Sequence, residues 1–241
     1  MKRHQCYIFI AVTTLALITA CGGSGSSDTV DTNNPANEPT PAGGSITLET
    51  CTPAPVAVGV SRYSRVFKGC NNAGVAQYYE LDECVRDDST GLIWQGQTPA
   101  GTGLRANDQY KSNFDSTTSL QKWTGTGYVA PTTEEINDIN NSIGYKNAVN
   151  ASRLCGSDVW RLPTKDELLN IVKTSESPMI DNAAFPNTSQ NYAWYWSSSA
   201  YEGGSYRTTA AWDVNFIKGN ADADNRNINF GNHFNTVRLV R

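Results

Sequence analysis

The sequence predicts an α+β domain over residues 51–241, because strand signals stand at both ends of this stretch and helix signals stand in its middle. Short apolar or aromatic runs bounded by turn residues open the stretch. Two capping-box patterns follow in the middle, and an alternating apolar and polar run lies near the end. The order of strands, then helices, then strands is typical of an α+β architecture.

The first part of the stretch is rich in strand signals, at Val75–Leu81 and Leu92–Gln95, which Asn-Asn, Asp-Asp and Thr-Gly pairs punctuate. The middle is helical, since Thr132–Glu135 and Thr164–Glu167 both fit a capping box. Tyr145–Cys155, between these boxes, favours a further helix. The second box leads into an apolar stripe at helical spacing, formed by Leu168, Leu169, Ile171 and Val172.

The last part returns to predicted strands at Trp194–Ser198, Ala211–Ile217 and Val237–Arg241. The middle one alternates, because successive side chains of a strand point to opposite faces. One face would carry Trp212, Val214 and Phe216, and the other Asp213 and Asn215. We expect the aromatic face to lie in the core and the polar face to meet solvent or a ligand.

Residues 1–20 have the features of an export signal. Lys2 and Arg3 precede the apolar stretch Tyr7–Ile18, which is too short for a comfortable membrane span. A small residue before Cys21 and an aliphatic residue two positions further back resemble the lipobox of bacterial lipoproteins. The resemblance implies cleavage before Cys21 and a lipid on this cysteine, whereas an ordinary secretory signal is the alternative. Gly22 in place of Asp favours the outer membrane.

Residues 21–50 comprise the lipidated cysteine and a linker rich in Gly, Ser, Thr, Asn and Pro, which cannot bury a core of its own. A flexible tether of this length spans roughly 30 Å, which suits a domain held clear of a lipid surface. A surface loop of the domain is the alternative. The mature chain has a net charge of −6 and no visible basic face. We therefore expect no nucleic-acid partner.

Cysteine usage supports export. Cys6 leaves with the signal and Cys21 carries the lipid. The remaining cysteines are Cys51, Cys70, Cys84 and Cys155. An even number in an oxidising compartment predicts two disulfides. Three pairings are possible, and we favour Cys51–Cys70 with Cys84–Cys155. A zinc site is the alternative, but the sequence contains no C-x-x-C spacing.

Signals for catalysis and for metal binding are weak. His233 is the only histidine after the signal, so a multi-histidine metal site is excluded and a catalytic triad would have to use it. The chain contains no G-x-S-x-G, H-E-x-x-H or P-loop motif. Asn220, Asp222 and Asp224 place oxygen-bearing side chains at alternate positions, which suggests calcium binding. An EF-hand loop would also need Gly at 225 and Glu at 231, but Asn225 and Gly231 occupy these positions. We assign no catalytic residue, metal ligand or cofactor, and expect no enzyme activity.

Several sequence blocks carry a family resemblance. They are Asp88–Trp94, Trp160–Leu169, Tyr195–Ser199, Ala211–Phe216 and Val237–Arg241. Together they resemble the Lcl C-terminal domain of bacterial surface proteins, over roughly residues 80–241. The resemblance implies a C-type-lectin-like fold: a small twisted antiparallel sheet, two main helices and a loop-rich ligand face. Formylglycine-generating enzymes share that broad fold but use a cysteine pair in the C-terminal part, and no cysteine follows Cys155 here.

A second resemblance lies within residues 196–241. Seven asparagines fall within positions 215–235, and the run looks like the variable region of proteins diversified by retroelements. That resemblance implies a fixed scaffold of Trp196, Trp212, Val214, Phe216, Val237 and Leu239. It implies a variable, ligand-binding face of Tyr201, Glu202, Tyr206, Arg207, Asp213, Asn215, Asn220, Asp222, Asp224, Asn225, Arg226, Asn227, Asn229, Asn232, His233 and Asn235. The alternative is a run of turns, because Asn tolerates left-handed backbone conformations.

These features predict an outer-membrane lipoprotein that displays a ligand-binding domain on the cell surface. Its partner would be a protein or a glycan on another cell or surface, and it would contact the membrane through the lipid anchor only. We expect a monomer. The alternatives are an invariant adhesin for glycans or matrix and a structural envelope protein that self-associates. A mixture of aromatic side chains with Ser, Gly and Asn suits recognition better than catalysis.

Overall fold

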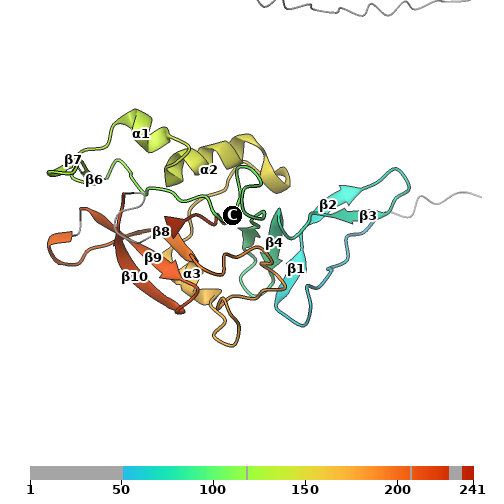
Figure 1. Ribbon diagram of the computed structural model, residues 1–241. Coiled ribbons are helices and arrows are strands. Elements are labelled where there is room, and N and C mark those ends of the chain that lie inside the picture. Colours follow the sequence, from blue (N-terminus) through green and yellow to red (C-terminus); the bar gives the residue numbers. More distant parts are fainter. Residues whose placement is uncertain (1–50, 118, 207, 228–234) are drawn as a thin grey trace, which may run out of the picture. The chain divides into compact units, whose positions relative to one another are not determined.

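The computed structural model describes residues 51–117, 119–206, 208–227 and 235–241, with only the backbone described at Tyr206. A four-stranded sheet is the largest sheet in this part of the chain (Figure 1). Its strands lie in the order β10, β9, β8, β11. They are β8 (Trp194–Ala200), β9 (Ala210–Asn215), β10 (Asn220–Asn225) and β11 (Asn235–Thr236). The first three run antiparallel, and β11 runs parallel to β8.

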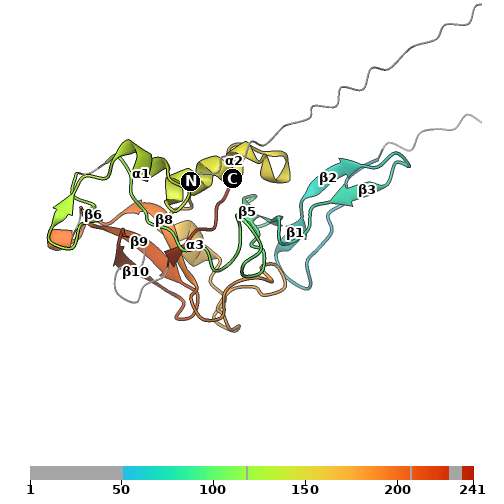
Figure 2. The same cartoon turned by 45° about the horizontal axis from the view of Figure 1, so that its top comes forward.

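A three-stranded antiparallel sheet and two hairpins complete the strands. The small sheet has the order β1 (Tyr63–Arg65), β4 (Cys84–Asp87), β5 (Ile93–Gln95). The hairpins are β2 (Phe67–Cys70) with β3 (Ala76–Tyr78), and β6 (Lys122–Trp123) with β7 (Tyr128–Val129). Figures 1 and 2 show the two hairpins at opposite ends of the domain.

Three short α-helices lie between the strands: α1 (Thr133–Asn137), α2 (Ser142–Ala151) and α3 (Lys165–Asn170). Single 3₁₀ turns occupy Leu154–Gly156 and Gly204–Tyr206. Both predicted capping boxes are confirmed. The Thr132 and Thr164 side chains each accept a hydrogen bond from the backbone N–H three residues later, and the glutamate at that position accepts one from the backbone N–H of the threonine. The mixture of helices with mainly antiparallel strands confirms the predicted α+β class.

Two helix boundaries differ from the prediction. The helix expected at Tyr145–Cys155 starts three residues earlier and stops at Ala151, because Arg153 and Cys155 both have a left-handed backbone (φ 52° and 50°). The apolar stripe after the second capping box outlasts its helix. Of that stripe, Ile171 caps α3 rather than belonging to it.

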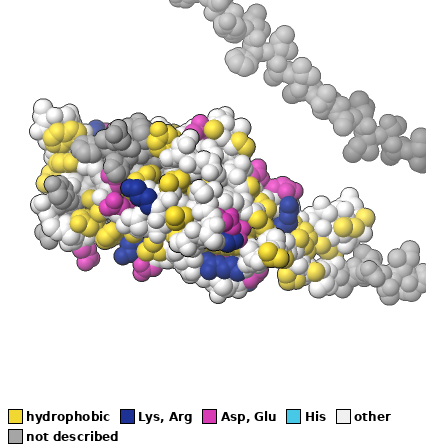
Figure 3. All heavy atoms as spheres, turned by 60° about the horizontal axis from the view of Figure 1, so that its bottom comes forward, with side chains coloured by type: hydrophobic (Ala, Val, Ile, Leu, Met, Phe, Trp, Pro, Cys, Tyr) yellow, Lys and Arg dark blue, Asp and Glu magenta, His cyan; other side chains and the backbone are white. Residues whose placement is uncertain are grey.

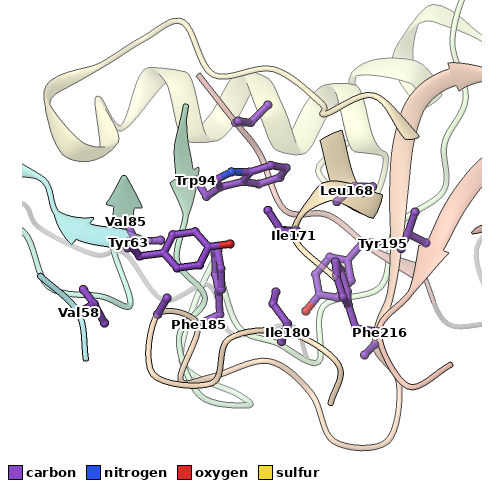
Figure 4. Packing of buried hydrophobic residues seen from close by; sticks show 14 residues of the cluster. Val58, Tyr63, Val85, Trp94, Leu168, Ile171, Ile180, Phe185, Tyr195 and Phe216 are labelled. Atoms are coloured by element: carbon purple, nitrogen blue, oxygen red, sulfur yellow. The ribbon is translucent and has the colours of Figure 1, made fainter. Parts of the chain in front are cut away.

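The four-stranded sheet is packed on both faces. On one face Tyr195, Val214 and Phe216 join Leu168 of α3 in a cluster that extends to Trp94 of β5 (Figure 4). On the other face lies a second cluster, made of Tyr145, Val149, Trp160, Trp196, Ala211, Val237 and Leu239 among others. The expected scaffold residues are therefore buried, with the exception of Trp212, which is half-buried.

Both favoured disulfide pairings are confirmed. Cys84–Cys155 joins β4 to the 3₁₀ turn after α2, inside the second cluster. Cys51–Cys70 joins the first described residue to the end of β2. Within the described residues, no helix is long and apolar enough to cross a membrane.

Two strand predictions are corrected. No strand is predicted at residues 220–225, yet they form β10, whose backbone pairs with β9 from Asn220↔Asn215 to Asn225↔Ala210. The strand expected at Val237–Arg241 is replaced by the shorter β11 just before it. Val240 makes isolated bridges to Trp94 and Arg161 instead of joining a ladder.

Candidate functional site

A groove with a volume of about 430 Å³ runs along β8, and we call it the β8 groove. Its walls come from β8 itself, from the first half of α2, from the segment before α3 and from the loop before β6. It is lined by Asn113, Asp115, Ser142, Ile143, Lys146, Arg161, Leu162, Thr164, Ser197, Ser198, Ser199, Ala211 and Arg226. Most of these residues are polar, but Ile143, Leu162, Ala211 and the carbon atoms of the longer side chains add apolar surface, so the groove suits a ligand with both polar and apolar parts.

The β8 wall of the groove is a bulge. Trp196 pairs with Asp213 and the next pair is Ala200 with Ala211, so three serines of β8 stand opposite one residue of β9. The Ser198 N–H turns out of the ladder and donates to the Pro163 carbonyl at 2.7 Å. Bulges redirect side chains and often border functional sites. Here the bulge turns a run of hydroxyl-bearing residues into the wall of a cavity.

The floor of the groove is held rigid by Arg226, which is 2% exposed. Its guanidinium donates to the Asn113 carbonyl at 2.7 Å, to Asp115 Oδ2 at 2.8 Å and to the Ala210 carbonyl at 3.1 Å. The Ser142 hydroxyl donates to Asn113 Oδ1 at 2.6 Å. Hydrogen-bonded networks of this kind stiffen a site and fix its shape.

Burial alone would raise the pKa of Asp115, but hydrogen bonds from Thr117 and the charge of Arg226 outweigh it. The pKa of Asp115 therefore lies below its ordinary value. The floor thus contains a salt-bridged carboxylate at neutral pH, not a free acid.

Arg161 and Lys146 are the two cationic side chains at the rim of the groove, and of these two only Arg161 forms an ion pair. Arg161 bonds to both carboxylate oxygens of Glu167, at 2.8 and 2.6 Å. The hydrogen bond from Arg161 lowers the pKa of Glu167. Lys146 is half-buried, and no hydrogen bond or ion pair joins its ammonium group to another described residue. Lys146 is therefore the groove cation that is ready to meet a ligand.

The predicted ligand face is divided by burial. Five of its members lie in the interior, so the expectation that Asp213 and Asn215 face solvent or a ligand is wrong. These five are Asp213, Asn215, Asp224, Arg226 and Asn235. The exposed or half-buried members are Tyr201, Glu202, Asn220, Asp222, Asn225 and Asn227. Arg207, Asn229, Asn232, His233, the Tyr206 side chain and the lipidation candidate Cys21 lie outside the described residues.

The buried asparagines have structural roles. Asn215 Oδ1 accepts the Ile217 and Lys218 N–H groups and so shapes the turn between β9 and β10. Asn235 donates to Asp213 Oδ2. Buried polar groups need such partners, which a hydropathy pattern does not reveal.

The exposed members do not converge on one point. Tyr201 packs edge-on against Trp212 with ring centroids 5.2 Å apart, and Lys165 lies 4.6 Å from the same indole. Asn225 and Asn227 instead hold the β6–β7 hairpin. Asn225 donates to the Tyr128 hydroxyl at 2.7 Å and Asn227 donates to the Gln121 carbonyl at 2.9 Å. Among the members of the predicted face that the structure describes, only Arg226 lines the β8 groove.

Sequence reasoning missed most of the groove. The three consecutive serines at 197–199 stand inside a block quoted for its family resemblance, so they offered a signal. Lys146 offered none, because its place depends on α2 packing beside β8. On the face shown in Figure 3, basic, acidic and hydrophobic side chains are interspersed and not gathered by sign.

No three His, Cys, Asp or Glu side chains of the described residues converge as a metal-binding group. A smaller polar cluster does stand out in the sheet, where Asp213, Asp224 and Asn235 are all buried.

A model of the Lcl C-terminal domain matches residues 83–241. No curated protein and no solved structure matches the chain.

Proposed function

Because the chain belongs to the Lcl C-terminal domain family, we propose that it is a surface-displayed lipoprotein that binds a ligand in the β8 groove. The unpaired ammonium of Lys146 beside a wall of hydroxyls is the observation that carries the proposal. A pocket that is already rigid and offers a few uncommitted polar groups is the usual form of a binding site.

The proposal is binding and not catalysis. The Ser197 hydroxyl donates to the Trp212 carbonyl at 2.7 Å, and the Ser198 hydroxyl donates to the Pro163 carbonyl at 3.2 Å. A nucleophilic serine would instead donate to a general base. Neither hydroxyl is arranged for attack on a substrate.

We propose a C-type-lectin-like arrangement for this domain. In its support, the chain has one central, mainly antiparallel sheet with α2 and α3 packed on its two faces. Cysteine 21, the tether to residue 50 and the two disulfides support export and lipid anchoring. Incorporation of a labelled fatty acid, lost in Cys21→Ser, tests the anchor. Protease digestion of intact cells tests surface display.

The binding experiment screens the whole mature chain against a glycan array and against an array of surface proteins. A ligand of the groove should bind Lys146→Gln about 10- to 100-fold more weakly, which is the value of a hydrogen bond from a charged group. Lys68→Gln is the matched control, because this exposed lysine lies on β2, away from the groove. Equal binding by the wild type and Lys146→Gln would refute the groove as the site.

Diversification by a retroelement remains our hypothesis for the exposed positions of the predicted face. An invariant adhesin for glycans or matrix is the alternative. A near-copy of the last ~140 bases of the gene that differs only at adenines, beside a reverse-transcriptase reading frame, would support diversification. Flanking DNA without it would leave an invariant binder.

A further inference from the structure

Another cavity, with a volume of about 470 Å³, lies at the base of the β2–β3 hairpin, and we call it the hairpin cavity. Figures 1 and 2 show β1 and this hairpin at the end of the domain where the described chain begins. The cavity shares no residue with the β8 groove. It is lined by Pro53, Ala54, Pro55, Ser64, Arg65, Val66, Phe67, Tyr78, Arg86, Asp88, Ile93 and Arg241. Three arginines and one acid therefore stand among apolar side chains.

The charges around the hairpin cavity favour an anion. Arg65 forms an ion pair with Glu80 at 3.0 Å, and Arg86 forms one with Asp88 at 3.1 Å. Both acids are exposed, and exposed ion pairs contribute little free energy, so both guanidinium groups can exchange these partners for a ligand. Arg241 forms no ion pair with another described residue, and no carboxylate is among the main influences on its pKa.

Arg241 is held in place but leaves a donor unused. Its guanidinium donates to the Cys155 carbonyl at 3.1 Å and lies 5.4 Å from the centre of the Trp160 ring. Its Nε atom is buried and donates to no described residue. Buried donors are almost always satisfied, so this atom calls for an acceptor. Burial lowers the pKa of Arg241, and a bound anion would stabilise the charged form.

The same end of the domain exposes apolar side chains. Val56 and Phe67 are each 37% exposed, and Val75 is 56% exposed. Phe67 lines the hairpin cavity, Val56 directly follows its first wall, and Val75 lies in the loop between β2 and β3. Apolar and aromatic groups beside cationic side chains are typical of proteins that bind at a lipid surface, where the apolar groups enter the interface and the cations meet the headgroups.

The predicted tether joins the domain beside the hairpin cavity. Cys51 is disulfide-bonded to Cys70, the last residue of β2, and the lining of the cavity begins two residues further on, at Pro53. A lipid on Cys21 would keep this end of the domain within roughly 30 Å of a lipid surface, which raises the effective concentration of that surface at the cavity. This placement rests on the lipid anchor proposed above.

We propose that the hairpin cavity binds the phosphate headgroup of an anionic phospholipid, with Phe67 and Val75 in contact with the lipid surface. Guanidinium groups bind phosphate oxygens through charge-assisted and often bidentate hydrogen bonds. The net charge of the mature chain is −6, so general attraction to an anionic surface does not supply the affinity, and the arginines of the cavity must do so. This contact would add to the lipid anchor, which the sequence alone predicts as the sole contact with the membrane.

The test measures co-sedimentation of the mature chain with vesicles, using Cys21→Ser so that no anchor holds the protein to the lipid. Vesicles of phosphatidylglycerol and phosphatidylcholine in equal parts should bind this chain about tenfold more tightly than vesicles of phosphatidylcholine alone. Arg241→Gln should weaken the binding about tenfold, which is the value of a hydrogen bond from a charged group. Val75→Ser should weaken it about fivefold, because the side chain loses its contact with the lipid.

Two further variants control for folding and for charge. Arg86→Gln removes a cavity cation whose side chain is half exposed, so it should weaken binding about fivefold without disturbing the fold. Lys218→Gln is matched in charge and should bind like the parent chain, because this exposed lysine lies in the turn between β9 and β10 and does not line the cavity. Thermal unfolding establishes that each variant is folded.

A chain that binds neither kind of vesicle would overturn the proposal. So would an equal loss of binding in Lys218→Gln, or unchanged binding in both Arg241→Gln and Arg86→Gln. Glycerol 3-phosphate that binds the chain as tightly as the vesicles do would overturn a lipid as the source of the phosphate. The test chain carries no anchor and has an intact β8 groove, so failure of this contact is distinguishable from failure of the proposed anchor or of ligand binding in the groove.

Discussion

Replacing Arg226 by methionine is the sharpest test of how this domain is built. Methionine keeps most of the buried volume but removes three hydrogen bonds, to the Asn113 and Ala210 carbonyls and to the Asp115 carboxylate. Asp115 then loses its ion-pair partner beside the groove floor. Removing one member of a fully buried ion pair costs about 3–5 kcal/mol, mostly because the other is left uncompensated. The Asp115 side chain is 28% exposed, so we expect the lower end of that range, about 3 kcal/mol, which lowers Tm by about 6–12 °C for a domain of this size.

The assay is urea denaturation of the full chain with its disulfides intact, followed by tryptophan fluorescence. Asn220→Ala, an exposed substitution on the adjoining β10, is the control and should stay within about 0.5 kcal/mol of the wild type. The double variant Arg226→Met with Asp115→Ala should be less destabilised than the sum of the single variants, by about 0.5–3 kcal/mol. An Arg226→Met domain as stable as the wild type would refute the assignment of Arg226 as a structural residue.

Three further predictions concern stability. Loss of the Cys84–Cys155 disulfide should lower the free energy of unfolding by about 4 kcal/mol and loss of the Cys51–Cys70 disulfide by about 3 kcal/mol, because the two bonds close loops of 71 and 19 residues. Urea denaturation of Cys84→Ala and Cys51→Ala checks this order. Trp196→Ala should cost about 3–5 kcal/mol and the half-buried Trp212→Ala clearly less, and equal losses of Tm would contradict the packing. Because the pKa of Asp115 is lowered in the folded state, the ionised carboxylate stabilises the fold fully above pH 3.8, the ordinary pKa of the group, and this stabilisation is lost as the pH falls through the lowered pKa. Acid titration should therefore destabilise the wild type more than Asp115→Asn.

Features set by neighbouring residues were predictable from the sequence. The capping boxes at Thr132 and Thr164 need only four consecutive residues, and both form as predicted. The strands β8 and β9 follow from their apolar and aromatic composition. The disulfides follow from four cysteines in an exported chain, although the choice of pairing was one of three.

Features that depend on distant partners were not predictable. The sequence of β10 contains no large apolar residue, and it becomes a strand because β9 offers a free edge along its whole length. Asp213 looks like a solvent-facing residue in an alternating strand, yet the face it occupies is covered. A period of two tells which residues share a face, but it cannot tell that both faces are buried. The β8 bulge and Lys146, which make the groove, depend on the same tertiary packing.

The division of the polar residues by burial bears on how this surface can evolve. A position can vary freely only if its side chain holds nothing else in place, because buried polar groups cost free energy when a partner is lost. Asn215 shapes a turn, Arg226 fixes the groove floor and Asp213 contacts Asn235, so none of them is free in this sense. Variation is compatible with the fold at exposed positions such as Asn220 and Asp222. The described part of the Asn-rich run therefore contains buried residues with structural roles and exposed residues, and only the exposed residues can vary without destabilising the domain.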